Sequence, residues 1–142
     1  MSTLHPYLHL NGNTEEAFSF YKSVFGGELS IMRYGEAPPG ETKPSPGAAK
    51  KIMHVSLPIG KETMLMGSDM PEAMPPAVMG TNFSITVSAD SEEEARRVFE
   101  GLSAGGQVVM PLDKTFWGAY FGMLVDKFQI HWMVSYDRGG QK

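Results

Sequence analysis

The chain has no cysteine, no long apolar run and no excess of basic residues, and each absence narrows what it can be. Without cysteine it forms no disulfide, which suits a reducing compartment. No apolar run approaches the roughly 18 residues that a membrane helix needs, and no basic-then-apolar signal opens the sequence. The net charge of −4, with both signs mixed, gives no basic surface for nucleic acid. We therefore expect a cytoplasmic protein, with one compact unit of 142 residues and no nucleic-acid or membrane partner.

A strand followed by an amphipathic helix is predicted from the segment YLHLNGNTEEAFSFYKSVFGGEL, which begins at Tyr7. Leu4 to Leu10 alternates polar and apolar side chains as a half-buried strand does, with three rings on one face: His5, Tyr7 and His9. An apolar stripe at helical spacing follows and is expected to be mostly buried: Ala17, Phe20, Tyr21, Val24 and Phe25. Asn13 is placed to cap this helix, and Gly26-Gly27 is placed to end it.

The same order of parts returns in the second half of the chain. Asn82 to Ser88 reads as a strand, Ser91 with Glu94 matches a capping box, and Gly105-Gly106 closes the segment. Its apolar stripe is expected to be buried and consists of Ala95, Val98, Phe99 and Leu102. Because strand, cap, stripe and double glycine recur in the same order, we interpret the chain as an internal duplication.

Three more strands are predicted in each half, so each half reads βαβββ. They are Glu28 to Tyr34, Ile52 to Pro58, Glu62 to Gly67, Gln107 to Leu112, Tyr120 to Val125 and Ile130 to Tyr136. The predicted class is α+β, with one module over about 1–69, a second over about 80–138, and a connection over 70–79. Asp69, just after the fourth strand, is interpreted as an ordinary loop acid.

Two segments rich in proline or methionine each have two interpretations. Gly35 to Lys51 carries four prolines and almost nothing apolar, so we expect it to be a mobile loop, either a lid or a tolerated insertion. The connection and the strand before it carry five methionines, Met64, Met66, Met70, Met74 and Met79. Methionine is flexible and polarizable, so these side chains either line an adaptable site or, as we favour, fill gaps beneath a loop.

Three segments resemble the PhnB-like branch of the vicinal-oxygen-chelate superfamily: the opening segment from Tyr7, the segment FWGAYFG that begins at Phe116, and the ending VDKFQIHWM. That group includes glyoxalase I, ring-cleaving dioxygenases, fosfomycin-modifying enzymes and bleomycin-resistance proteins. The resemblance spans nearly the whole chain. It implies paired βαβββ modules whose sheets curl into an eight-stranded, mostly antiparallel half-barrel around a pocket, in a homodimer. Gln129 stands where this branch usually has glycine, which leaves the geometry of that turn open. An older label for some relatives, ubiquinone-pathway methyltransferase, is disfavoured because no strand-to-helix glycine-rich loop is present.

Superfamily enzymes typically hold a divalent metal with four side chains, and the matching positions of this chain depart from that pattern. The resemblance places them at His5, at Leu65 or Met66, at Asn82 and at Met133. Leucine cannot bind a metal, methionine sulfur is a poor ligand for a hard ion, and a lone amide is weak. We therefore expect no catalytic metal at the usual place and no cofactor.

The pocket candidates are His5, Tyr7, His9, Asn82, Phe116, Trp117 and Met133. A histidine in a pocket can act as a general base near pH 7, but a hydrogen-bonded structural role is favoured for His54, His131 and the other two. Phe116 and Trp117 are either a ligand platform or a turn that plugs the barrel mouth. Trp132 is expected to face the helix layer, opposite to His131 and Met133. Two functions stay open: a metal-free binding protein for a small polar metabolite or drug, and an enzyme of the superfamily, such as a metal-dependent lyase or dioxygenase.

Overall fold

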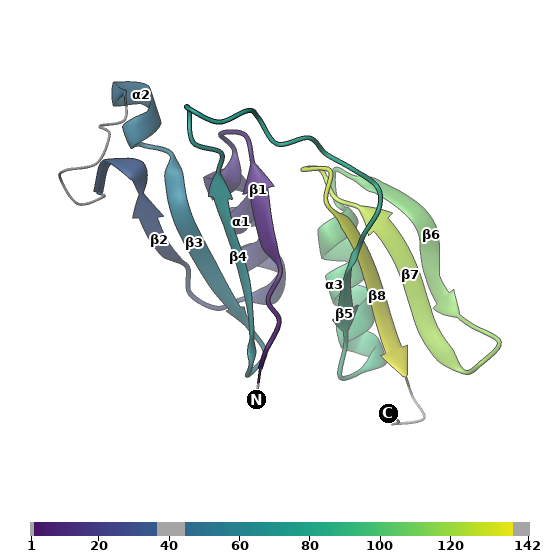
Figure 1. The fold of residues 1–142 in the computed structure, drawn as a ribbon. Coiled ribbons are helices and arrows are strands. Elements are labelled where there is room, and N and C mark those ends of the chain that lie inside the picture. Colours follow the sequence, from purple (N-terminus) through teal and green to yellow (C-terminus); the bar gives the residue numbers. More distant parts are fainter. Residues whose placement is uncertain (1, 37–44, 138–142) are drawn as a thin grey trace. The chain divides into compact units, whose positions relative to one another are not determined.

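The computed structural model describes residues 2–36 and 45–137, and the chain divides into two compact units, Met1–Val78 and Met79–Lys142. Each unit contains one four-stranded sheet and one long helix (Figure 1). Among the described residues, no helix is long and apolar enough to cross a membrane.

The first unit has the predicted order of strand, helix and three strands. β1 (Tyr7–Leu10) is followed by α1 (Thr14–Phe25), β2 (Ser30–Arg33), β3 (Ile52–Ile59) and β4 (Thr63–Asp69). The strand order is β1-β4-β3-β2, in which β1 and β4 run parallel and the other neighbours antiparallel. The closing strand β4 therefore lies beside the opening strand β1.

The second unit repeats this arrangement, so the prediction of two βαβββ modules is confirmed. β5 (Ile85–Ser88) leads to α3 (Glu92–Ser103), β6 (Gln107–Lys114), β7 (Ala119–Val125) and β8 (His131–Asp137). The strand order is β5-β8-β7-β6, again with one parallel pair, β5 and β8. The eight strands form two mixed four-stranded sheets, and neither sheet closes into a barrel.

The core of the first unit lies between α1 and one face of its sheet, and its centre is Phe18. This side chain is fully buried, together with Ala17, Tyr21 and Val24 of the same helix. Phe18 packs over Gly67 of β4, where an added Cβ would lie 2.8 Å from the ring. The predicted stripe was therefore partly wrong: Phe20 and Phe25 are only partly buried at its margin, and Phe18 was not included.

The second unit also places a helix phenylalanine over a strand glycine, but on a different strand. Phe99 of α3 lies over Gly122 of β7, where an added Cβ would lie 2.6 Å from its ring. The predicted stripe of this helix is buried as expected, and so is Trp132 of β8 on the face that α3 covers. A glycine in one central strand thus lets a phenylalanine of the helix approach each sheet closely.

The start of α1 is stabilised by Asp69 rather than by Asn13. Asn13 occupies the N-cap position, but its side chain makes no capping hydrogen bond. Instead the buried Asp69 accepts hydrogen bonds from the Gly12 N–H at 2.8 Å, the Thr14 N–H at 3.1 Å and the Thr14 hydroxyl at 2.6 Å. Its second oxygen accepts from the Ile52 N–H at 2.9 Å. The prediction that Asp69 is an ordinary loop acid was therefore wrong, since this carboxylate joins β4, α1 and β3.

The second unit also contains a buried aspartate, Asp126, in the β7–β8 turn. It accepts from the backbone N–H groups of Phe128 and Ile130 at 2.8 and 3.0 Å, and from the Trp132 indole N–H at 2.9 Å. Gln129 of this turn has a φ of 70°, the left-handed conformation for which glycine is the usual residue. These hydrogen bonds hold the turn in that conformation without glycine.

Two strands, β1 and β5, begin three residues later than predicted, and the long loop is partly structured. β1 begins at Tyr7, because Pro6 has no N–H to donate and the Met64 N–H donates to the His5 ring instead of to a backbone carbonyl. β5 begins at Ile85 rather than at Asn82. The segment predicted as a loop contains a 3-10 turn, η1 (Tyr34–Glu36), and a short helix, α2 (Pro46–Ala49). The lid interpretation falls mainly on 37–44, which lie outside the described residues.

Candidate functional site

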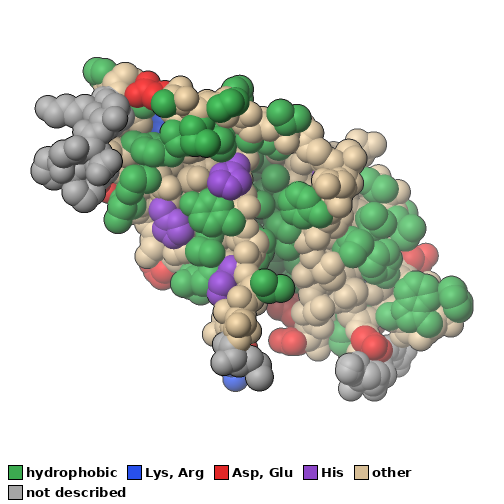
Figure 2. Space-filling view, in the orientation of Figure 1, with side chains coloured by type: hydrophobic (Ala, Val, Ile, Leu, Met, Phe, Trp, Pro, Cys, Tyr) green, Lys and Arg blue, Asp and Glu red, His purple; other side chains and the backbone are tan. Residues whose placement is uncertain are grey.

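α1 covers one face of the first sheet. The opposite face carries the predicted ring-bearing residues, and we call it the helix-free face. Leu8 and Leu10 of β1 point toward α1 and are buried, so the alternating Tyr7 and His9 lie on the helix-free face. Strand register adds Met66 of β4 to this face, because it pairs with Tyr7. Met66 in turn pairs with Ser56 of β3, and His54 lies two residues before Ser56 on the same face. Figure 2 shows histidine side chains there, among hydrophobic ones.

Tyr7 is the centre of a cluster with His9 and His54. Its ring centroid lies 5.1 Å from that of His9 and 5.8 Å from that of His54, both tilted by 38°. Its hydroxyl lies 3.4 Å from His54 Nδ1, within hydrogen-bonding distance. The sequence predicted the shared face of Tyr7 and His9. It could not place His54 beside them, because that contact spans 47 residues and depends on β4 lying between β1 and β3.

Tyr34 of η1 lies close to this cluster and was not among the predicted residues. Its hydroxyl donates to the Asp69 backbone carbonyl at 2.7 Å, which fixes the ring at the end of β4. Burial raises the pKa of the Tyr34 phenol above its ordinary value, and the nearby Asp69 and Tyr7 raise it further. A protonated Tyr34 therefore stays a hydrogen-bond donor to Asp69, with its own oxygen able to accept.

His5 lies just outside β1 and has a structural role. Its Nδ1 accepts a hydrogen bond from the Met64 N–H at 3.0 Å, and its Nε2 lies 3.1 Å from the Thr3 hydroxyl. Because an N–H can only donate, Nδ1 carries no proton, so in the neutral ring the proton is on Nε2. Both ring nitrogens of His5 are thus already engaged.

The predicted site residues of the second unit do not gather in one place within that unit. Asn82 is exposed before β5, and Met133 is half-buried in the middle of β8, paired with Thr86 of β5. Phe116 and Trp117 form the tip of the β6–β7 hairpin, with ring centroids 4.9 Å apart at 89°. They are 98% and 62% exposed, so neither packs into the core of its own unit.

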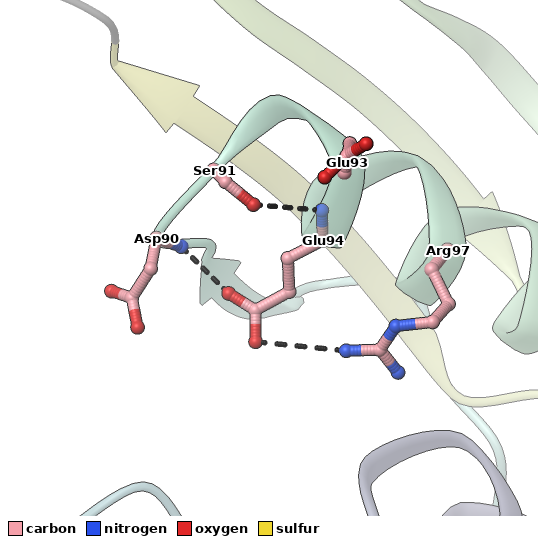
Figure 3. Close-up of a pocket in the computed structure, with 5 residues that line it drawn as sticks. All are labelled: Asp90, Ser91, Glu93, Glu94 and Arg97. Carbon is pink, nitrogen blue, oxygen red and sulfur yellow. Dashed lines mark hydrogen bonds and ion pairs between the residues drawn. The ribbon is translucent and has the colours of Figure 1, made fainter.

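The N-terminus of α3 carries a shallow depression, and the hydrogen bonds within it cap the helix (Figure 3). The Glu94 N–H donates to the Ser91 hydroxyl at 3.0 Å, as the predicted capping box requires. The Glu94 carboxylate accepts from the Asp90 N–H at 2.7 Å, one residue earlier than the box predicts, and pairs with Arg97 at 3.8 Å. The lining also includes Glu93, so the free carboxylates would repel an anion at this helix end.

Paired βαβββ units, each with a helix on one face of a mixed sheet, define the class of protein to which the chain belongs. A model of the Glyoxalase/Bleomycin resistance protein/Dioxygenase superfamily matches residues 3–134. The chain belongs to this superfamily.

Individual relatives agree with this assignment over nearly the full length. Protein YjdN from Escherichia coli (strain K12) is 31% identical over 142 residues, with 93% of each chain covered. The crystal structure of protein PA1353 from Pseudomonas aeruginosa is 40% identical, with a TM-score of 0.82 over 96% of this chain and 98% of that one. The PhnB protein from Bacillus cereus, a candidate 3-demethylubiquinone-9 3-methyltransferase, is 27% identical, with a TM-score of 0.72 over 95% of this chain and 99% of that one. The resemblance to the PhnB-like branch is thereby confirmed.

The residues that the resemblance places at the superfamily's metal positions do not suit a divalent ion. Leu65 is buried against α1, so of the two alternatives Met66 is the one on the helix-free face. Met66 and Met133 offer thioethers, which are poor ligands for hard ions, and the His5 nitrogens are hydrogen-bonded. Among residues 2–36 and 45–137, no group of three or more His, Cys, Asp or Glu side chains could hold an ion together.

Proposed function

We propose that this protein binds a small polar metabolite or drug on the helix-free face of the first sheet, without a catalytic metal. The observation that carries the proposal is the cluster of Tyr7, His9 and His54, in which polar rings contact one another at the surface of the sheet. The core between α1 and the sheet does not need polar rings on the opposite face. A binding site does need a few polar groups within an apolar surround. Met64 and Met66 supply that surround.

Membership of the superfamily supports a pocket of this kind. The side chains that could act as metal ligands decide between simple binding and metal catalysis. A Lewis-acid mechanism needs several ligands to hold the ion and a vacant position for substrate. The thioethers of Met66 and Met133 do not provide such ligands. Binding by the drug-resistance members needs only shape and hydrogen bonds, which Tyr7, His9 and His54 can supply.

The methyltransferase activity suggested for the Bacillus cereus relative does not extend to this chain in our proposal. The β1–α1 connection has a single glycine, Gly12, whose N–H donates to Asp69. A nucleoside cofactor would need a glycine-rich loop with free N–H groups at this place. Those groups are engaged by a carboxylate of the protein itself.

We further propose that the protein is a cytoplasmic homodimer. β6 is an edge strand of the second sheet, and it exposes Val108, Val109 and Met110, which are 45%, 55% and 46% accessible. Exposed apolar edges are usually paired or covered in the native assembly. Sedimentation across micromolar concentrations tests this, and a monomer throughout would contradict it.

The decisive experiment combines elemental analysis with a thermal-shift screen of metabolites and antibiotics. We expect substoichiometric zinc, nickel, manganese and iron, and no effect of chelator on the melting temperature of the wild type or of His5→Ala. A ligand at a hundredfold excess over its Kd should stabilise by about 2.7 kcal/mol, roughly 5–10 °C for a chain of this size. Stoichiometric metal that depends on His5 would instead support a metal-dependent lyase or dioxygenase.

A further inference from the structure

The chemistry around Tyr7 also indicates which class of ligand the helix-free face takes. We propose that Tyr7 and His54 recognise the acidic group of a flat, unsaturated small molecule, whose ring lies against Tyr7, His9 and Met66. This inference rests on the proposed function and narrows it to a class of ligand. It is carried by two independent features of the face, its ring surface and its lack of charge.

The ring surface is built from three neighbouring strands. Tyr7 and His9 are two residues apart on β1, and Met66 of β4 is directly paired with Tyr7. His54 of β3 approaches the same ring from the far side of β4, to 5.8 Å between centroids. The residue of β4 paired with His9 is the small Ser68, which is itself buried. Aromatic rings and thioethers favour contact with the face or edge of another ring.

The lack of acidic side chains on the face disfavours a cation as the ligand. Register and alternation place no Asp, Glu, Lys or Arg from β1, β3 or β4 on this face: the strand positions there are Tyr7, His9, His54, Ser56, Pro58, Met64, Met66 and Ser68. The carboxylate of Asp69, at the end of β4, points to the opposite face, where its two oxygens accept four hydrogen bonds. No acidic side chain of these strands would therefore repel an anion or pair with a cation.

The polar groups that do lie on the face can donate to an acidic group. The Tyr7 hydroxyl and His54 Nδ1 are 3.4 Å apart, a long contact that an incoming oxygen could replace. A hydroxyl and an imidazole N–H both donate to a carboxylate, and such charge-assisted hydrogen bonds are about twice as strong as neutral ones. An amide offers a neutral acceptor of the same shape, and an ammonium offers no acceptor. The geometry thus favours a carboxylate over an amide or an ammonium group.

Three probes that share a phenyl ring separate these possibilities: benzoate, benzamide and benzylamine. Each is titrated into protein labelled with ¹⁵N-histidine, and the four imidazole signals are followed by NMR. We expect benzoate to shift the signals of His9 and His54, and to leave His131 of the second sheet unchanged. We expect its affinity to exceed that of benzamide by about tenfold, the ratio that one stronger hydrogen bond gives.

Matched variants assign the effect to the Tyr7 hydroxyl. Tyr7→Phe removes one oxygen and keeps the ring, so benzoate binding should weaken about tenfold while benzamide binding changes less. Tyr136→Phe makes the same change on β8 of the second unit and should leave benzoate binding as in the wild type. Equal benzoate affinity for Tyr7→Phe and the wild type would overturn the assignment.

The remaining outcomes distinguish this inference from the function on which it rests. Benzamide or benzylamine binding at His9 and His54 as tightly as benzoate would leave the site in place and refute the anion. If no probe shifts these signals while the metabolite screen finds a ligand that does, the ligand class is wrong and the proposed function stands. If neither probes nor screened compounds shift them, both fail.

Discussion

Replacing Asp69 by asparagine tests whether one buried carboxylate holds the first unit together. The change keeps the size of the side chain but turns one acceptor oxygen into an NH₂ group. Whichever way the amide is oriented, the NH₂ faces at least one backbone N–H, since Gly12 and Thr14 donate to one oxygen and Ile52 donates to the other. Donor would face donor at a residue that is 2% exposed.

The cost follows from counting the hydrogen bonds. With the amide oxygen toward α1, the Ile52 N–H loses its acceptor, and a buried unsatisfied donor costs about 1–3 kcal/mol. The hydrogen bonds from Gly12 and Thr14 survive but lose the charge that roughly doubled their strength. The sum is roughly 2–4 kcal/mol, which is a large share of the 5–15 kcal/mol that stabilises a typical domain.

Urea unfolding followed by far-UV circular dichroism measures this loss. At an m-value of about 1–3 kcal/mol/M the midpoint should fall by roughly 1–2 M. Asp90→Asn is the matched control, because it makes the same change in charge at an exposed position before α3. If the midpoints of Asp69→Asn and Asp90→Asn agree within error, the carboxylate does not hold β4, α1 and β3 together as described.

Three further predictions test the core, the second buried aspartate and the tyrosine near the proposed site. Phe18→Ala should lower the unfolding free energy by about 3–5 kcal/mol and the half-buried Phe20→Ala by clearly less, and equal losses in urea melts would contradict the observed helix face. Trp132→Phe removes the indole donor to Asp126 and should cost roughly 2–4 kcal/mol, against less than about 0.5 for the exposed Trp117→Phe. The folded-state pKa of Tyr34 is raised above its ordinary 10.0, so unfolded chains lose the proton first, and the contribution of Tyr34 to stability is full below pH 10.0 and declines as the pH rises through the folded-state pKa. Tyr34→Phe should therefore show a smaller loss of stability above pH 10.0 than the wild type in pH-dependent melts, and parallel curves would refute the assigned environment.

The architecture could be predicted because it is encoded locally. Alternation gave the strands, the double glycines ended the helices, and the repeat of these parts gave two βαβββ modules. The helix face was harder to place, since α1 carries apolar residues nearly all around between Ala17 and Phe25. Only the contact of Phe18 with Gly67 decides which of them face the sheet, and that contact joins residues far apart in the chain.

The buried aspartates could not be predicted for the same reason. Asp69 and Asp126 each follow or lie within a turn, where aspartate is common for local reasons. What distinguishes Asp69 is that β1 and β4 are parallel neighbours, which brings the start of α1 to the end of β4. The contact of Tyr7 with His54 also depends on the strand order, because β4 lies between their strands. Local sequence thus identified half of the proposed site, and strand order supplied the other half.

The duplication separates the features that both units share from those that only one unit has. Both units place a helix phenylalanine over a strand glycine, Phe18 over Gly67 and Phe99 over Gly122, so close packing of helix on sheet is common to both. The opposite faces differ. Where the first sheet pairs Tyr7 with Met66, the second pairs Thr86 with Met133, and no ring stands at that position of β5. Because the rings of the first sheet lie on the face that no helix of their unit covers and have no counterpart at this position of the second sheet, we assign them in our proposal to binding rather than to stability.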